Sequence, residues 1–292
     1  MDAAVAGRPS IARSSRFLPE RTNGYSYLQN GGWAATSLLE SQTWNSSYSP
    51  LMDTSVAVPR SRFVKVPHVR QLCSWDCGLA CVLMALKALD IQDCDMKSLA
   101  KLCSTTSIWT VDLAHLLRRF SIDVAFLTVT IGANPNFALE TFYKEHMVED
   151  GERVNRLFEN APQVGIEIQW RSISGEELSM LILSGHYIAI ALVDKHKLSQ
   201  PWLEELFLSD CCGVSSGYTG HYVVICGYDM ETDEFEIRDP ASSRECERIS
   251  LGCLDEARKS FGTDEDILLI SLDKTDGERK VTLAPNCVHK EL

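Results

Sequence analysis

Helix-like and strand-like patterns of hydrophobic residues follow one another through the middle of this chain. Leu79–Leu89 consists of helix formers without an internal glycine or proline and is apolar on nearly every face, which predicts a buried central helix. Apolar residues at helical spacing predict three further helices, with a break at Gly151 in the last: Met96–Leu102, Val111–Phe120 and Phe137–Phe158.

The strand patterns lie mostly in the second half of the chain. β-branched and aromatic residues predict strands over five segments: Ile122–Ile131, Tyr187–Val193, Tyr222–Tyr228, Glu234–Arg238 and Ile267–Leu272. The polar residues Met230–Asp233 predict a hairpin turn between two of them. Helices first and antiparallel strands later is the order of an α+β domain.

The two ends of the chain differ from this middle part. Residues 1–58 are rich in Ser, Gly and Asn without a helical or strand period, so we expect a disordered N-terminal tail. Residues 276–292 are polar, and we expect a second tail there. One domain is therefore expected over residues 59–275. The apolar stretches are shorter than the about 18 to 20 residues that cross a bilayer, and the N-terminus lacks the pattern of a secretory signal. The sequence therefore predicts a cytoplasmic protein that does not bind membranes.

Composition narrows the class of partner. The chain has 292 residues, of which 45% are hydrophobic and 23% charged, the profile of a globular protein. Its formal net charge of -12 opposes binding to a nucleic-acid backbone. The 11 cysteines are odd in number and lack the paired CxxC spacing of a zinc site, which indicates reduced thiols.

The sharpest local pattern is the stretch from Gln71 to Cys81. Cys77 lies at the start of the predicted helix, where unpaired backbone N–H groups and the helix dipole favour a negative charge, so it is a candidate nucleophile. Gln71 carries an amide able to donate to an oxyanion on an acyl group, and we expect Gly78 to leave space for a substrate. The alternative interpretation is that Cys77 is a small buried residue, like Cys73 and Cys81.

A partner base for that thiol occurs about 140 residues later. His221 begins a predicted strand, and Asp239 ends the next one, where its carboxylate is placed to orient the imidazole. Taken singly, a histidine at a strand end and an Asp-Pro pair are most often structural. The order Gln71, Cys77, His221 and Asp239, with the cysteine on a helix start and the last two on neighbouring strands, predicts a thiol-based catalytic site.

This pattern resembles the papain-like double-glycine peptidases, in which a Cys-His-Asp site works with a glutamine in the oxyanion hole. The resemblance implies an α+β, papain-like cysteine-peptidase fold, with a helical half that carries Cys77 and an antiparallel sheet that carries His221 and Asp239. It also implies a thiol hydrolase that cleaves a peptide or isopeptide bond without a cofactor.

A second resemblance covers about residues 64–273. It rests on motifs spread over this region: Val66-Pro67-His68, Trp75-Asp76-Cys77-Gly78-Leu79-Ala80-Cys81, Gly132-Ala133-Asn134-Pro135-Asn136, Tyr218-Thr219-Gly220-His221-Tyr222, Arg238-Asp239-Pro240-Ala241-Ser242-Ser243 and Ser260-Phe261-Gly262-Thr263-Asp264-Glu265-Asp266. In these motifs the chain resembles the plant-type guanylyl cyclase family, also found in animals as guanylyl cyclase domain-containing proteins. The resemblance implies a lyase that converts GTP into cGMP and pyrophosphate, for which Mg²⁺ or Mn²⁺ is expected.

Few residues suit nucleotide or metal chemistry, because the sequence has no glycine-rich phosphate-binding loop. Ser260 and Gly262, with Lys274 downstream, loosely match a short plant-cyclase motif and are the candidates for binding GTP. Asp264 and Asp266 are the candidates for holding the metal, with a charged turn as the alternative interpretation.

Three functions therefore remain open. The family resemblance places a guanylyl cyclase first, whereas the residues alone favour the thiol hydrolase. The third is a non-catalytic binding module that uses the same groove. The expected partner is accordingly GTP or a peptide, and the sequence does not identify a protein partner.

Overall fold

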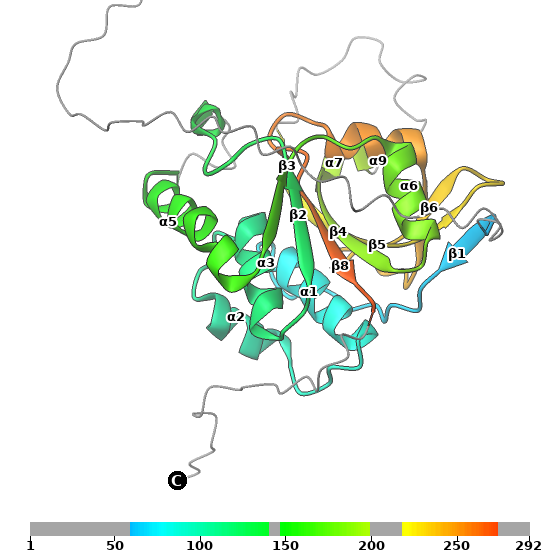
Figure 1. Cartoon of the computed structure of the whole chain (residues 1–292), viewed down its shortest axis with the longest axis horizontal. Coiled ribbons are helices and arrows are strands. Elements are labelled where there is room, and N and C mark those ends of the chain that lie inside the picture. The colour runs from blue at the N-terminus through cyan, green and yellow to red at the C-terminus, as the bar shows by residue number, and fades with distance from the viewer. Residues whose placement is uncertain (1–58, 140–146, 199–217, 274–292) are drawn as a thin grey trace, which may run out of the picture. The chain divides into compact units, whose positions relative to one another are not determined.

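The computed structural model describes residues 59–139, 147–198 and 218–273 (Figure 1). The strands are β1 (Ser61–Phe63), β2 (Val124–Thr128), β3 (Glu167–Trp170), β4 (Tyr187–Asp194), β5 (Gly220–Asp229), β6 (Glu234–Arg238), β7 (Glu247–Ser250) and β8 (Ile267–Ser271). The helices are α1 (Cys77–Ala88), α2 (Met96–Cys103), α3 (Thr110–Arg119), α5 (Met147–Asn160), α6 (Gly175–Leu183), α7 (Lys195–Leu198) and α9 (Leu251–Arg258), with short 3-10 helices η1 (Pro135–Leu139) and η2 (Pro162–Val164).

The described strands form one mixed sheet. Their order is β3-β2-β8-β4-β5-β6-β7, and β1 pairs with β5 away from this path. Neighbouring strands are antiparallel except β2 and β3, which are parallel. The α+β class is thus confirmed, while the expected purely antiparallel sheet is wrong at this one edge. The long connection through η1, α5 and η2 brings the chain back in the same direction, as parallel pairing requires.

Both faces of the sheet are covered by helices, which explains why its central strands are apolar throughout. Along β4, Ile188 and Ile190 pack into a core with α1 and α3, whereas Ala189 and Ala191 pack into a second core with α6 and α9. Successive residues of a strand point to opposite faces, so a strand buried on both sides needs apolar residues at every position. The sequence pattern predicts a single helical half, and the layer of α6 and α9 on the other face corrects this prediction.

Most elements predicted from the sequence are confirmed within a few residues. The hairpin at Met230–Asp233 is confirmed, because β5 and β6 pair on either side of it. The predicted break at Gly151 is wrong, since α5 runs through this position. A Cβ there would meet no atom within 4 Å, so this glycine faces open space and lowers only helix propensity.

Several short elements were not predicted. The strands β1, β3 and β7 have three or four residues each and are largely exposed, so they carry little hydrophobic pattern. The expected tails, residues 1–58 and 276–292, lie outside the described residues, so their limits stay predictions. Within the described ranges, no helix combines the length and the apolar character needed to span a membrane. All cysteines in these ranges are free thiols, as predicted.

Candidate active site

Cys77 is the first residue of α1, and its side chain lies at an uncapped helix start. Asp76 occupies the capping position, but its side chain makes no capping hydrogen bond to the helix. Its carboxylate instead accepts hydrogen bonds from the backbone N–H groups of Leu72, at 3.1 Å, and Cys73, at 3.0 Å. The N–H groups of the first helical turn therefore remain directed at the region around Cys77, where they favour a negative charge.

Gly78 allows α1 to pack closely against α3 and β5. A Cβ at this position would lie 2.9 Å from Leu113 Cδ1 and 3.1 Å from Tyr222 Cδ2. Because Gly78 has no side chain, the start of α1, which carries Cys77, lies close to Tyr222, the residue that follows His221 in β5. The expectation that Gly78 leaves space for a substrate is wrong, because protein side chains fill that space.

His221 connects Cys77 with Asp239. It lies at the start of β5 and is 3% exposed. Its Nε2 donates a hydrogen bond of 2.7 Å to Asp239 Oδ1, which leaves Nδ1 for its hydrogen bond with the Cys77 side chain. Burial alone would lower the pKa of His221, but the hydrogen bonds with Asp239 and Cys77 raise it to about 9. At neutral pH the imidazole is therefore positively charged.

Asp239 is held in its ionised form. Burial would raise the pKa of its carboxyl group, but the hydrogen bond and the charge of His221 outweigh burial and lower this pKa below its ordinary value. The Cys77 side chain, an imidazolium and a carboxylate thus follow one another in hydrogen-bonded order. This arrangement orients the imidazole and stabilises its charge.

The segment between β1 and α1 fixes Gln71 beside Asp239. Four hydrogen bonds join it to β5, β6 and the residues after β6: Val64 N to the Cys226 carbonyl at 2.8 Å, Arg238 Nε to the Val66 carbonyl at 2.9 Å, His68 Nε2 to the Asp239 carbonyl at 2.8 Å, and Gln71 N to the Pro240 carbonyl at 2.9 Å. His68 has no role that its sequence neighbours predict. Its contact with Asp239 joins residues far apart in the sequence, so no local pattern predicts it. The one signal for His68 is its place in the Val66-Pro67-His68 motif.

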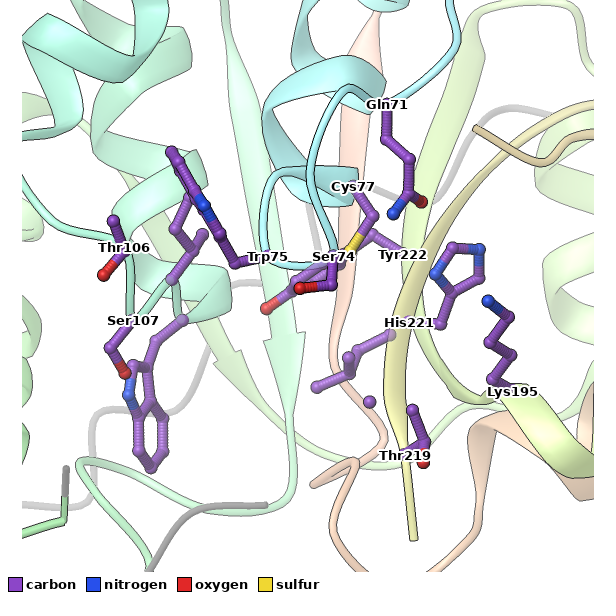
Figure 2. A pocket seen from close by; sticks show the side chains of 14 residues that line it. Gln71, Ser74, Trp75, Cys77, Thr106, Ser107, Lys195, Thr219, His221 and Tyr222 are labelled. Atoms are coloured by element: carbon purple, nitrogen blue, oxygen red, sulfur yellow. The ribbon is translucent and has the colours of Figure 1, made fainter. Parts of the chain in front are cut away.

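The side chain of Gln71 is placed to donate to a reacting group. Its Nε2 donates to the Cys73 carbonyl at 2.8 Å, and its buried Oε1 has no hydrogen-bond partner among the described residues. An amide nitrogen carries two hydrogens, so one remains for another acceptor. Figure 2 shows Gln71, Cys77 and His221 turned toward one another in the pocket, so the structure brings together the four residues proposed from the sequence.

A pocket of about 470 Å³ opens over these side chains (Figure 2). Its lining comes from the loop before α1, the loop before α3 and the adjoining ends of β4 and β5: Gln71, Ser74, Trp75, Cys77, Thr106, Ser107, Ile108, Trp109, Leu192, Lys195, Thr219, Gly220, His221 and Tyr222. Two tryptophans and two aliphatic residues make much of this wall apolar. A mostly apolar pocket with a few convergent polar groups is the usual form of a ligand site.

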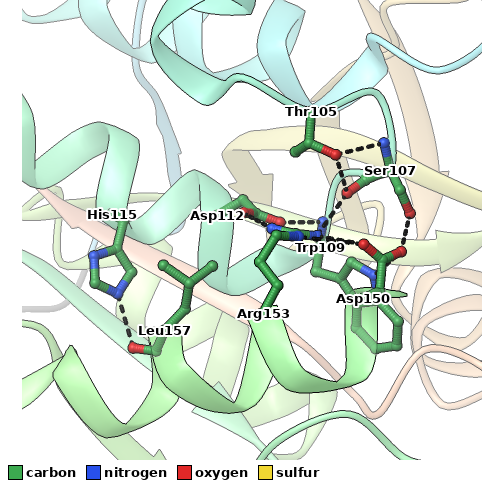
Figure 3. A network of polar contacts seen from close by, with 8 residues as sticks. All are labelled: Thr105, Ser107, Trp109, Asp112, His115, Asp150, Arg153 and Leu157. Carbon is green, nitrogen blue, oxygen red and sulfur yellow. Dashed lines mark hydrogen bonds and ion pairs between the residues drawn. The ribbon is translucent and has the colours of Figure 1, made fainter. Parts of the chain in front are cut away.

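One wall of the pocket, which contains Ser107 and Trp109, is fixed by a buried ion network (Figure 3). Arg153 on α5 forms ion pairs with the carboxylates of Asp112 and Asp150, and its Nη2 donates to the Ser107 carbonyl at 2.9 Å. Asp150 in turn accepts hydrogen bonds from the Ser107 hydroxyl and, at 3.2 Å, from the Trp109 indole. The network therefore ties this wall to α5.

The candidates for binding GTP do not gather at this pocket. Ser260 is buried just after α9, and its hydroxyl donates to the Glu256 carbonyl at 3.0 Å. Gly262 has φ +102, and a Cβ there would lie 2.8 Å from ring atoms of Tyr218. Neither residue lines the pocket, and Lys274 lies outside the described residues.

The candidates for holding a metal do not line the pocket either, although both border a small neighbouring cavity that shares Ile108, Trp109, Leu192 and Tyr222 with it. Asp264 Oδ1 accepts hydrogen bonds from the Thr130 hydroxyl at 2.7 Å and the Asn134 amide at 3.1 Å. Asp266 is 8% exposed, and burial together with the charge of Asp264 raises its pKa well above the ordinary value. In the described part of the chain, no three His, Cys, Asp or Glu side chains are placed to hold a metal ion. These carboxylates therefore do not fit a metal centre for a triphosphate.

Comparisons with known proteins find a family model and relatives that match most of this chain. A family model described as guanylylate cyclase matches residues 66–270, which include Gln71, Cys77, His221 and Asp239. Guanylyl cyclase 1 of Arabidopsis thaliana is 61% identical over 216 residues, which make up 74% of this chain and 79% of that protein. Among solved structures, a Bacillus anthracis protein described as a C39-like peptidase aligns with a TM-score of 0.42 and 15% identity, over 71% of this chain and 94% of that one.

Proposed function

The chain belongs to the guanylylate cyclase family, and within that family we propose that it works as a thiol hydrolase whose nucleophile is Cys77. One observation carries the proposal: His221 is hydrogen-bonded to both Cys77 and Asp239, and Cys77 and His221 line one pocket. The substrate class is a peptide or isopeptide bond, since these residues supply the nucleophile, the acid and the oxyanion donor that acyl transfer from nitrogen requires.

The first half of the reaction forms a thioester. The Cys77 thiolate attacks the carbonyl carbon, and the oxygen becomes an oxyanion that accepts hydrogen bonds from Gln71 Nε2 and from the backbone N–H groups at the start of α1. The carbon–nitrogen bond then breaks, and the leaving nitrogen takes the proton of the His221 imidazolium. Asp239 keeps the imidazole ring oriented throughout.

The second half releases the acyl group. Neutral His221 now accepts a proton from a water molecule, whose oxygen attacks the thioester carbon. The carbon–sulfur bond breaks, the product leaves as a carboxylic acid, and Cys77 and His221 return to their starting protonation states. A non-catalytic binding module would need neither the buried imidazolium of His221 nor its position between Cys77 and Asp239.

Guanylyl cyclase activity is the second candidate, and the name of the Arabidopsis relative favours it. This activity would convert GTP into cGMP and pyrophosphate with Mg²⁺ or Mn²⁺. Asp264 and Asp266 do not fit the metal centre that this reaction would need, so they supply no catalytic step for it.

A paired assay on the full chain separates the two candidates. One arm measures labelling of Cys77 by a thiol-reactive peptide electrophile, and the other measures cGMP formed from GTP with Mg²⁺ or Mn²⁺. Thiol chemistry predicts labelling that is absent in Cys77→Ala and at least about 100-fold slower in His221→Ala. Cys81→Ala is the matched control, because Cys81 lies one turn further along α1 and burial raises the pKa of its thiol.

Metal-dependent cGMP formation that survives Cys77→Ala, together with Cys77 labelling no faster than that of the exposed Cys73, would refute the thiol hydrolase and assign the cyclase activity.

A further inference from the structure

The lining of the pocket over Cys77 contains basic but no acidic side chains among the described residues, although the protein as a whole is acidic. The chain has a formal net charge of -12, yet none of the described residues that line the pocket is Asp or Glu. The basic residues of the lining are Lys195 and His221, and the pKa of His221 is raised to about 9 by the hydrogen bonds described above, against the effect of burial. The charge of His221 is paired with the Asp239 carboxylate at 2.7 Å, so an anion entering the pocket meets the Lys195 ammonium and the start of α1.

Lys195 is tied to the strand that carries His221. It begins α7 directly after β4, whose last residues pair with Gly220 and His221. Its backbone N–H donates to the Thr219 carbonyl at 2.9 Å, which fixes the chain beside the start of β5. Figure 2 shows its side chain next to the imidazole of His221, among the residues that line the pocket.

The opposite end of the groove carries the opposite charge. A second cavity of about 540 Å³ includes Glu149 and Asp150. It shares part of its wall with the first: Trp75, Thr106 and Ser107. Asp150 is paired with Arg153, whereas Glu149 is exposed. A substrate that lies along both cavities therefore meets the ammonium group of Lys195 at the His221 end and the carboxylate of Glu149 at the other end.

We infer that the pocket selects substrates with a carboxylate on the leaving-group side of the scissile bond, and that Lys195 binds this carboxylate. The inference rests on the proposed thiol hydrolase. Because the leaving nitrogen takes its proton from His221, the groups attached to that nitrogen lie beside Lys195. When the leaving group is an amino acid, a single carbon separates its nitrogen from its carboxylate. The substrate class is thus a peptide that loses a C-terminal residue, since the reverse orientation would place this carboxylate toward Glu149.

Iodoacetate and iodoacetamide form a matched pair of probes for this inference. In both, the Cys77 thiolate displaces iodide from the same methylene group, but only iodoacetate carries a carboxylate. The experiment measures the alkylation rate of Cys77 in the full chain by mass spectrometry, with Cys73 as an exposed reference thiol. We expect Lys195→Gln to lower the iodoacetate rate by about three- to tenfold and to leave the iodoacetamide rate within about twofold.

Two further variants sharpen the comparison. Lys195→Arg keeps the charge and should keep most of the preference for iodoacetate. Lys197→Gln is the matched control, because Lys197 is exposed, pairs with Glu256 at 3.6 Å and does not line the pocket, so neither rate should change.

The outcomes that overturn the inference are distinct from failure of the proposed function. A ratio of the two rates that is unchanged in Lys195→Gln would remove Lys195 from substrate selection. Stronger protection of Cys77 by inorganic pyrophosphate than by hippurate, an N-acyl amino acid with a free carboxylate, would assign the pocket to a phosphate-bearing ligand instead. If both reagents modify Cys77 no faster than Cys73, the proposed thiol hydrolase itself fails.

Discussion

Arg153 is the residue on which the wall of the pocket most depends. Arg153→Met removes the guanidinium group and leaves Asp112 and Asp150, whose side chains are 6% and 8% exposed, without their cation. Removing one partner of a buried ion pair costs about 3–5 kcal/mol. Because the Arg153 side chain is itself 28% exposed, we expect the lower end of that range, about 3 kcal/mol. At about 2–4 °C per kcal/mol, the melting temperature should fall by about 6–12 °C.

Thermal unfolding of the full chain, followed by circular dichroism, measures this loss. Arg156→Met is the matched control on the same helix. Arg156 pairs with Glu152 at 3.9 Å, and these side chains are 65% and 83% exposed. An exposed pair of this kind contributes about 0–1 kcal/mol, so the control should stay close to the wild type.

The protonation state of Asp112 provides a second check. Burial already raises the pKa of Asp112 despite the nearby charge of Arg153, and removal of that charge raises it further. A carboxyl group with a raised pKa in the folded state destabilises the protein above that pKa, so the loss in Arg153→Met should shrink as the pH falls. Combining the variant with Asp112→Asn and Asp150→Asn should restore most of the stability. A melting temperature within about 2 °C of the Arg156→Met control would refute the reasoning.

Two further predictions concern the residues around Cys77. Gly78→Ala places a Cβ 2.9 Å from Leu113 Cδ1, so chemical denaturation should show a loss of about 1–3 kcal/mol, and an unchanged midpoint would contradict the close packing of α1. An NMR titration of the His221 ring should give a midpoint of about 9, and Asp239→Asn should lower it, because the hydrogen bond with this carboxylate raises the pKa against the effect of burial. Since the folded pKa lies above the ordinary value of 6.5, the charged imidazole stabilises the fold fully below about pH 6.5, and this contribution is lost as the pH rises through about 9. A midpoint at or below 6.5 would contradict the charged pair.

The site residues could be located from the sequence because each obeys a local rule. Cys77 begins a helix, His221 begins a strand, and Asp239 follows a strand just before a proline, as expected from the pattern around each residue. The sequence order of Gln71 and these three residues then suggested that they meet. The distances and the buried state of His221 were not predictable, because they depend on the pairing of β5 with β6 and on α1 packing against β5.

The supporting contacts follow no local rule. His68 reaches the carbonyl of Asp239 across 171 residues of sequence, and Arg153 reaches Asp112 across 41. Neither contact leaves a periodic pattern in the chain. The helices α6 and α9 were not predicted for a different reason. Their hydrophobic residues pack into a second core, which exists because β4 is buried on both faces of the sheet.

Acylation of Cys77 by a chromogenic peptide ester tests the central claim most directly. A peptide p-nitrophenyl ester mixed with the full chain should release a rapid burst of nitrophenol, and the peptide that contains Cys77 should gain the mass of the acyl group. We predict that the burst is absent in Cys77→Ala and at least about 100-fold slower in His221→Gln. The absence of a burst in the wild type, with metal-dependent cGMP formation that persists in Cys77→Ala, would contradict the account.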